Sequence, residues 1–242
     1  MKEINVVLSP SEKLDQYDVW LVIDILRATT NIVNFFDLGG RMIIPAKTVE
    51  EARRIQSMLG KEWLLAGERN MLPPEGFDLG NSPLEYSESE LSRHPYAILT
   101  TSNGTSALLK ASRAGGHIFV ACARNAASAA QKAFNSGNSI GILCAGRNQK
   151  AGLDDIVCAG LVVDRFLKLD QGIALSDGAR VALEIWENCF DNLQRGVRSA
   201  QHADLLIGMG MEKDIVFSCE IDQTEKVPHL TEWEQYPAIE GY

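Results

Sequence analysis

The chain has 242 residues, of which 45% are hydrophobic and 23% are charged, as is typical of a globular protein with a core of its own. Its formal net charge of −9, without a basic cluster, excludes a nucleic-acid-binding surface, but a few local cations could still bind a small anionic substrate. No apolar run is long enough to cross a bilayer, and the first ten residues, MKEINVVLSP, lack the apolar core of a signal peptide, so we expect a cytoplasmic protein without a membrane partner.

Strand and helix patterns alternate along the first part of the chain. Apolar runs predict strands at residues 3–8, 18–25, 41–46 and 63–66. An apolar stripe predicts a helix over residues 29–38, and a capping box beginning at Thr48 starts a second helix that ends at Gly60. Residues 67–83 form a long predicted loop, and a loop of this length inside a compact domain is commonly functional.

The alternation continues downstream and then gives way to helices. The predicted strands are 96–101, 117–122 and 139–145, and the predicted helices are 105–114, 126–135, 153–169 and 177–193. A late strand over residues 216–221 and an irregular tail from residue 227 complete the pattern. Such alternation indicates an α/β fold, in which a mostly parallel sheet carries helices on both faces.

The chain is predicted to form a single domain over residues 1–242, because no linker or low-complexity stretch interrupts it. A short internal echo, ILRATTNIV and LTTSNGTSALL, twice places threonines between a strand and a helix. The echo leaves open two similar half-sheets, about residues 1–95 and 96–242. The five cysteines are widely spaced without a CxxC pair, so we expect reduced core residues rather than a zinc or redox site.

Polar turns follow several of the predicted strands, at the strand ends where ligands bind in open α/β sheets. Asp24 and Glu68 stand in two of these turns, and carboxylate oxygens are ligands that Mg²⁺ takes. The structural alternatives are a helix cap for Asp24 and a solvated loop residue for Glu68. Asp154 and Asp155 begin a later helix, where they could join the metal site or only complement the helix dipole.

Arginines and hydroxyls in the same turns offer anion recognition. Arg27 and Arg69 could bind an anion through two parallel hydrogen bonds, or form surface salt bridges instead. Thr29 and Thr30 could cap the next helix, present hydroxyl and N–H groups to a phosphate, or do both.

The turn TTSNGT at residues 100–105 adds a second anion-binding candidate. Its Asn-Gly pair favours a tight backbone, and glycine lets an anion approach the N–H groups closely. A plain turn is the alternative, since Asn-Gly is a general turn former. The four histidines are scattered without metal-ligand spacing, and only His202, in a polar stretch, is a candidate, with a lone surface histidine as the alternative.

Several motifs together resemble one family. VIDILRATT, GER, GFDLGNSP, TTSNGT, the CAG at 144–146 and the CAGLVVDR run from Cys158 are similar, in order, to the 2-phosphosulfolactate phosphatase family. The resemblance implies a three-layer α/β/α fold with a mixed sheet and a Mg²⁺-dependent phosphatase. The implied reaction converts 2-phospho-3-sulfolactate to 3-sulfolactate on a route to coenzyme M. Two departures are Asp154-Asp155, where Glu-Asp is expected, and His202-Ala203, where His-Gly is expected.

The resulting hypothesis assigns roles to three groups of residues. Asp24, Arg27 and Glu68 would be catalytic, and Asp24 and Glu68 would hold Mg²⁺ with Asp154 or Asp155. Arg27, Thr29, Thr30, Thr101, Asn103, Gly104 and Thr105 would bind the phosphate, and Arg69, Asn81 and Ser82 would bind the carboxylate or sulfonate.

Three questions stay open at this point. The attacking group is either a water oriented by a carboxylate or Asp24 itself, through an aspartyl-phosphate. A phosphatase of another small phosphorylated hydroxy acid and a non-catalytic phosphometabolite-binding module are the alternative functions. The apolar helices after residue 153 leave room for a homodimer.

Overall fold

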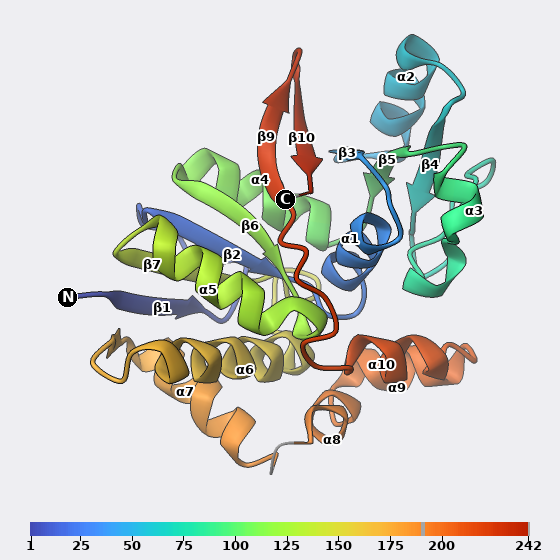
Figure 1. The fold of residues 1–242 in the computed structure, drawn as a ribbon. Coiled ribbons are helices and arrows are strands. Elements are labelled where there is room, and N and C mark those ends of the chain that lie inside the picture. Colours follow the sequence, from blue (N-terminus) through green and yellow to red (C-terminus); the bar gives the residue numbers. More distant parts are fainter. Residues whose placement is uncertain (190–191, 242) are drawn as a thin grey trace.

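The computed structural model describes residues 1–189 and 192–241. Within these residues, ten strands form one sheet in the order β4-β5-β3-β10-β9-β6-β2-β7-β1-β8 (Figure 1). The strands are β1 (Glu3–Val7), β2 (Val19–Ile23), β3 (Met42–Pro45), β4 (Trp63–Gly67), β5 (Tyr96–Thr100), β6 (His117–Ala121), β7 (Ser139–Cys144), β8 (Ala174–Leu175), β9 (His229–Trp233) and β10 (Tyr236–Glu240).

Helices connect most of these strands. They are α1 (Ala28–Asp37), α2 (Val49–Leu59), α3 (Glu88–Leu91), α4 (Gly104–Ala114), α5 (Ala126–Ser136), α6 (Leu153–Leu169), α7 (Asp177–Glu187), α8 (Leu193–Arg198), α9 (Gln201–Gly208) and α10 (Glu212–Ser218), with 3₁₀ turns at Pro83–Glu85 and Ala123–Asn125. No helix in the described part of the chain is long and apolar enough to cross a membrane.

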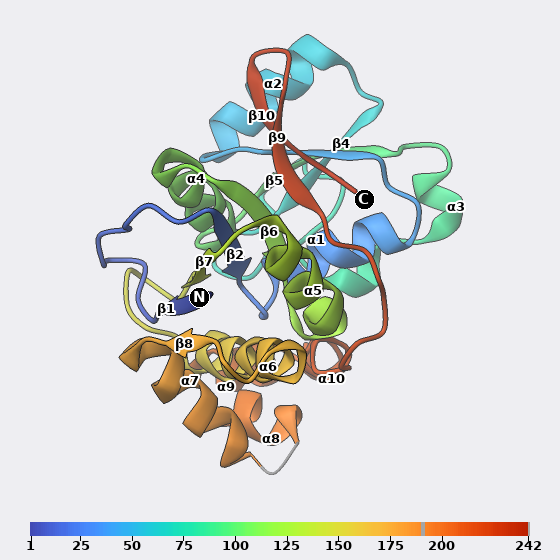
Figure 2. The same ribbon diagram turned by 60° about the vertical axis from the view of Figure 1, so that its left-hand side comes forward.

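The sheet lies between two helical layers, which confirms the predicted α/β/α fold. Side chains alternate along β2: Leu21 packs in a cluster with residues of α5 and α6, whereas Trp20 packs with residues of α1 and α4. Figure 1 shows α5 and α6 on one side of β2, and Figure 2 gives the same arrangement after a 60° turn. Because both faces are covered, all five residues of β2 are buried.

The sheet contains two parallel groups of strands that run in opposite directions. One group is β6-β2-β7-β1 and the other is β4-β5-β3. The hairpin β9–β10 lies between them and is antiparallel to both neighbours, so three reversals separate β6 from β3. The polar turns expected to form the site therefore follow strands of both directions, and do not all lie at the carboxyl ends of one parallel sheet. In Figure 1, β9 and β10 stand upright while β1 and β2 lie across the view, and this twist changes where the strand ends point.

The division into half-sheets at about residue 95 does not match the strand order. β1 and β2 pair with β6 and β7, whereas β3 and β4 lie beside β5, so strands from both sides of residue 95 alternate in space. The five cysteines are free, and four of them are buried, as expected of core residues.

Three sequence-based element predictions near the C-terminus need correction. Residues 216–221 do not form a strand, because helix α10 covers Glu212–Ser218 and buries Ile215 and Ser218, three residues apart. The tail is not irregular: it forms the β9–β10 hairpin, in which Pro237 lies where β10 pairs with β9 alone. Helix α7 ends at Glu187, and part of the predicted helix 177–193 lies outside the described residues.

Candidate active site

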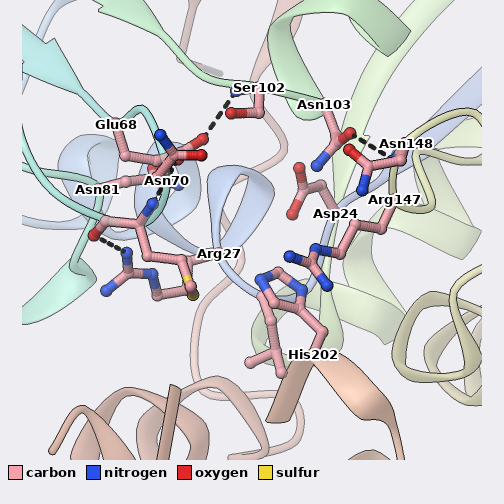
Figure 3. Close-up of a pocket in the computed structure, with 12 residues that line it drawn as sticks. Asp24, Arg27, Glu68, Asn70, Asn81, Ser102, Asn103, Arg147, Asn148 and His202 are labelled. Atoms are coloured by element: carbon pink, nitrogen blue, oxygen red, sulfur yellow. Dashed lines mark hydrogen bonds between the residues drawn. The ribbon is translucent and has the colours of Figure 1, made fainter. Parts of the chain in front are cut away.

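A pocket lies where the loops after β2, β4, β5 and β7 meet the start of α9 (Figure 3). We call it the inner pocket; it encloses about 110 Å³. Its lining consists of Asp24, Leu26, Arg27, Glu68, Asn70, Met71, Asn81, Ser102, Asn103, Arg147, Asn148 and His202. The two predicted metal ligands, Asp24 and Glu68, therefore share one pocket although they follow strands of opposite direction.

Asp24 lies between the N-termini of two helices. Its side chain is 7% exposed, and its Oδ1 accepts a hydrogen bond from the Ala28 N–H at the start of α1, at 3.3 Å. Its Oδ2 lies against the start of α4, since a Cβ on Gly104 would be 2.6 Å from it. Burial, opposed by the nearby His202, raises the pKa of Asp24 to about 6. Asp24 thus accepts a hydrogen bond from the first turn of α1 but is not its N-cap residue, which is Arg27, and it faces the pocket.

The turns after β2 and β5 are built by the same hydrogen bonds. In the first, the Asp24 N–H donates to Thr29 Oγ1 at 3.0 Å, and this hydroxyl donates to the Asp24 carbonyl oxygen at 2.9 Å. In the second, the Thr101 N–H donates to Thr105 Oγ1 at 3.2 Å, and this hydroxyl donates to the Thr101 carbonyl oxygen at 3.0 Å. The sequence echo therefore corresponds to a repeated strand-turn-helix structure.

The threonine hydroxyls are engaged within these turns. Thr30 also donates to a backbone carbonyl, that of Ile25, at 2.8 Å. Thr29, Thr30 and Thr105 are fully buried, Thr101 is nearly so, and the four do not line the inner pocket. Their side chains hold the N-termini of α1 and α4 in place, and the N–H groups of those helices are what an anion could meet.

Glu68 joins two loops at the edge of the inner pocket. Its Oε2 accepts from the Met71 N–H at 2.9 Å, and its Oε1 accepts from the Ser102 N–H at 2.7 Å. The preceding Gly67 has a φ of +140°, and a Cβ there would be 1.9 Å from the Thr100 carbonyl oxygen. Only glycine allows β4 to end this close to β5, so Gly67 sets the position of Glu68.

The long loop after β4 folds back and brings Asn81 into the pocket. The Asp78 and Leu79 N–H groups both donate to the Leu65 carbonyl oxygen, so the loop runs beside β4 again. Asn81 is 5% exposed, and its Oδ1 has no hydrogen-bond partner among the described residues. A buried unpaired acceptor is costly, so this oxygen is available to a ligand. Ser82 lies outside the pocket lining and donates to Asp214.

Arg27 lines the inner pocket, but its charge is already balanced. Its Nη1 is 2.6 Å from Oδ2 of Asp214 on α10, and both side chains are buried. Its Nη2 donates to the Met71 carbonyl oxygen at 3.1 Å. Arg27 therefore connects the turn after β2 to α10 and to the loop after β4.

Arg69 is directed away from the inner pocket. Its Nη1 donates to the Glu68 carbonyl oxygen at 2.6 Å. Its Nη2 donates to the Lys47 carbonyl oxygen at 3.1 Å and to Thr100 Oγ1 at 2.8 Å. The structure thus gives Arg69 a role in joining loops, and Arg69 is not part of the lining of the inner pocket.

Neither Asp154 nor Asp155 lines the inner pocket. Asp155 joins two loops, because Oδ1 accepts from the Ile25 N–H at 2.9 Å and Oδ2 accepts from the Gly146 N–H at 2.8 Å. Burial, with repulsion from Asp154, raises the pKa of Asp155 well above its usual value. Asp154 Oδ2 lies 3.2 Å from Nδ1 of His202.

Arg147 is a pocket residue that the sequence analysis did not single out. It follows β7 in the loop GRNQKAG, where Arg147 and Lys150 exchange backbone hydrogen bonds of 2.9 Å. Its guanidinium has no hydrogen bond or ion pair with any described residue. Figure 3 shows it reaching toward Asp24 and His202. A glycine-flanked basic loop after a buried strand was the available signal.

A second and larger pocket adjoins the first. This outer pocket encloses about 530 Å³ and lies between the loop after β7 and the start of α9. Its lining is Arg147, Asn148, Lys150, Ala151, Gly152, Leu153, Asp154, Ser199, Ala200, Gln201 and His202. Arg147, Asn148 and His202 line both pockets, so these three residues mark the junction.

The inner pocket has oxygen donors suited to one magnesium ion. Asp24 and Glu68 supply carboxylates, and Asn81 supplies an unpaired buried amide oxygen. No group of three His, Cys, Asp or Glu side chains within residues 1–189 and 192–241 could hold a metal. Mg²⁺, however, is commonly bound by one or two carboxylates, waters and substrate phosphate. Two carboxylates and an amide oxygen fit that pattern.

Comparison with known proteins identifies the family of the chain. A family model for 2-phosphosulpholactate phosphatase matches residues 6–233. A protein of Thermotoga petrophila named probable 2-phosphosulfolactate phosphatase is 36% identical over 94% of this chain and 95% of its own. A protein of the same name from Clostridium novyi is 36% identical over 98% of this chain and 99% of its own, and one from Deinococcus radiodurans is 34% identical over 91% of each. The chain therefore belongs to the 2-phosphosulpholactate phosphatase family, as its motifs predicted.

Proposed function

We propose that this protein hydrolyses the phosphate ester of 2-phospho-3-sulfolactate with the help of Mg²⁺. The observation that carries the proposal is the buried Asp24, placed between two helix N-termini in a pocket that also contains Glu68 and Arg147. Groups suited to a cation and groups suited to an anion thus line one small pocket. The names of the similar proteins support the same substrate.

Asp24, Glu68 and Asn81 would hold the magnesium ion. When bound, the ion would neutralise phosphoryl oxygens and so stabilise the charge of the transition state. Burial favours the neutral form of Asp24, and a divalent cation would reverse that preference by pairing with its carboxylate.

The phosphoryl group would lie in the inner pocket and the organic acid in the outer pocket. Arg147, whose guanidinium has no partner among the described residues, would bind phosphoryl oxygens, and the N-termini of α1 and α4 would add N–H groups and dipoles. Lys150 lies in the outer pocket, where a cation suits the sulfonate or carboxylate. The product, 3-sulfolactate, would continue on the route to coenzyme M.

Two chemical routes are consistent with this geometry. In one, a water oriented by a carboxylate attacks the phosphorus. In the other, Asp24 attacks first and forms an aspartyl-phosphate that water then hydrolyses. Rapid acid quenching of enzyme with ³²P-labelled substrate distinguishes them, because only the second route leaves radioactivity on the protein.

A panel of phosphate esters tests the proposal directly. Phosphate release is measured with 2-phospho-3-sulfolactate, phospholactate and phosphoglycolate, each with Mg²⁺ and with EDTA. We expect kcat/KM to be highest for the sulfonated ester and activity to disappear with EDTA. Equal rates across the panel would contradict the substrate assignment. Tight binding without phosphate release would favour a phosphometabolite-binding protein.

Location in the cytoplasm and assembly as a homodimer stay predictions from the sequence. Fractionation and light scattering test them independently of the ester panel.

A further inference from the structure

His202 and Asp154 form a buried pair at the junction of the two pockets. His202 Nδ1 lies 3.2 Å from Asp154 Oδ2, and their side chains are 17% and 5% exposed. A carboxylate can only accept, so this contact places a proton on Nδ1. Nε2 then lies at the other edge of the ring and has no hydrogen-bond partner among the described residues. The pair resembles the carboxylate-oriented imidazoles of general acid-base catalysts.

The position of His202 is defined by the two pockets. It lines both the inner pocket, with Asp24 and Glu68, and the larger outer pocket, with Lys150. A phosphate ester has its phosphoryl group on one side of the ester oxygen and its organic acid on the other. If the phosphoryl group occupies the inner pocket, the ester oxygen must lie at the junction. Of the three residues that line both pockets, Arg147, Asn148 and His202, only His202 has a side chain of the kind that serves as a general acid or base in enzymes.

We propose that His202, positioned by Asp154, is the general acid that protonates the leaving oxygen; this inference rests on the proposed function. The bond between phosphorus and the ester oxygen breaks, and its electron pair stays on that oxygen. The oxygen takes the proton of the imidazolium Nε2 and leaves as the hydroxyl of the product. Phosphorus gains hydroxide from water, and the second proton of that water returns to the imidazole through solvent.

The chemistry of the leaving group explains why such an acid is needed. The leaving oxygen of a hydroxy-acid ester is an alkoxide, which is a strong base and a poor leaving group. Negative charge develops on it in the loose transition state of phosphoryl transfer. A positioned proton donor contributes about 10²- to 10⁴-fold to such a step. Asp154 is then a positioning residue and has no part in binding the metal.

Leaving-group dependence tests this role. Phosphate release by wild type, His202→Ala and Asp154→Asn is measured with 2-phospho-3-sulfolactate, whose leaving group is an alkoxide, and with 4-nitrophenyl phosphate, whose leaving group needs no proton. We expect His202→Ala to lower kcat/KM for the first ester by about 10²- to 10⁴-fold and for the second by less than about tenfold. Asp154→Asn should show the same asymmetry with smaller losses.

Three further measurements complete the test. Added imidazole should restore part of the His202→Ala rate with the alkyl ester. If wild type does not hydrolyse the aryl ester, this rescue alone tests whether His202 is the general acid. His117→Ala, which removes an exposed imidazole at the start of β6, is the matched control and should retain wild-type rates. Thermal unfolding confirms that each variant is folded.

The possible outcomes separate the two proposals. Equal losses on both esters without rescue by imidazole would show that His202 acts by binding or structure, and would overturn the general-acid role while the phosphatase function stands. A folded wild type that releases phosphate from neither ester would instead overturn the proposed function, and this inference with it.

Discussion

The position of Asp24 shows a conflict between stability and function at a single residue. A carboxylate is buried at 7% exposure, beside a second acid in the same pocket. Burial raises its pKa from 3.8 to about 6, so the metal-free folded protein holds this proton more tightly than the unfolded chain does. The stabilisation by this group is therefore complete below about pH 3.8 and is lost as the pH rises through about 6.

Replacing Asp24 should separate these two effects. We expect Asp24→Asn to increase the free energy of unfolding in EDTA near pH 7 by about 1–3 kcal/mol, because no buried carboxylate must then ionise. The same change should lower phosphate release by at least about 10³-fold. Denaturant unfolding near pH 4 and pH 7 measures the first effect. Asp15→Asn, which changes an exposed carboxylate, is the control. An equal gain in the free energy of unfolding of Asp24→Asn at pH 4 and at pH 7 would contradict the explanation.

Gly104 offers a second test at this scale. A Cβ at this position would lie 2.4 Å from Ala28 Cβ and 2.6 Å from Asp24 Oδ2. Gly104→Ala should therefore push α4 away from Asp24, destabilise the fold by about 1–3 kcal/mol and lower kcat/KM. Gly208→Ala is the matched control, because no atom of the described residues would lie within 4 Å of its Cβ, and it should not destabilise the fold. Wild-type activity in Gly104→Ala would be evidence against this packing.

At the scale of elements, the β9–β10 hairpin joins the two parallel groups of strands. β9 pairs with β6 through Leu230 and His229, and β10 pairs with β3 through Ile239 and Glu240. Without the hairpin, β6 and β3 would each present an unpaired edge. The hairpin thus helps to set the relative position of the strands that end at Asp24 and Glu68.

A core substitution in β10 tests this structural role. Ile239 is fully buried in the cluster that contains α1 and α4 residues, so Ile239→Ala should lower the free energy of unfolding by about 2–5 kcal/mol. Glu232→Ala, at an exposed position on β9, should change it by less than about 0.5 kcal/mol. Denaturant titration measures both, and no difference between the variants would indicate an irregular tail.

At the scale of the whole molecule, metal binding should be coupled to folding. Asp24 and Glu68 come from strand groups that run in opposite directions, so a cation between them would join the two halves of the site. We expect Mg²⁺ at about 100 times its dissociation constant to stabilise the protein by about 2.7 kcal/mol. Removal of Mg²⁺ by EDTA should reverse this gain.

Glu68→Gln should lose most of this stabilisation. Because an amide nitrogen only donates, the glutamine oxygen can keep one of the two backbone hydrogen bonds that Glu68 accepts, so we also expect a free energy of unfolding in EDTA that is lower by about 1–3 kcal/mol. Thermal unfolding with Mg²⁺ and with EDTA makes the measurement. An identical gain in wild type and Glu68→Gln would place the metal elsewhere.

The sequence alone determined the strand-turn-helix units, the α/β class and the family, and it predicted Asp24 and Glu68 as acids of the site, which do line one pocket. The units and the fold class follow from periodicity and turn chemistry, which act over a few residues, whereas the family follows from the resemblance of the motifs and their order. Only the tertiary structure decided that Arg69 turns away, that Arg147 faces the pocket, and that His202 meets Asp154 from 48 positions along the chain. It also decided that the tail enters the middle of the sheet. Such contacts depend on which distant segments pack together, and no local pattern specifies that choice.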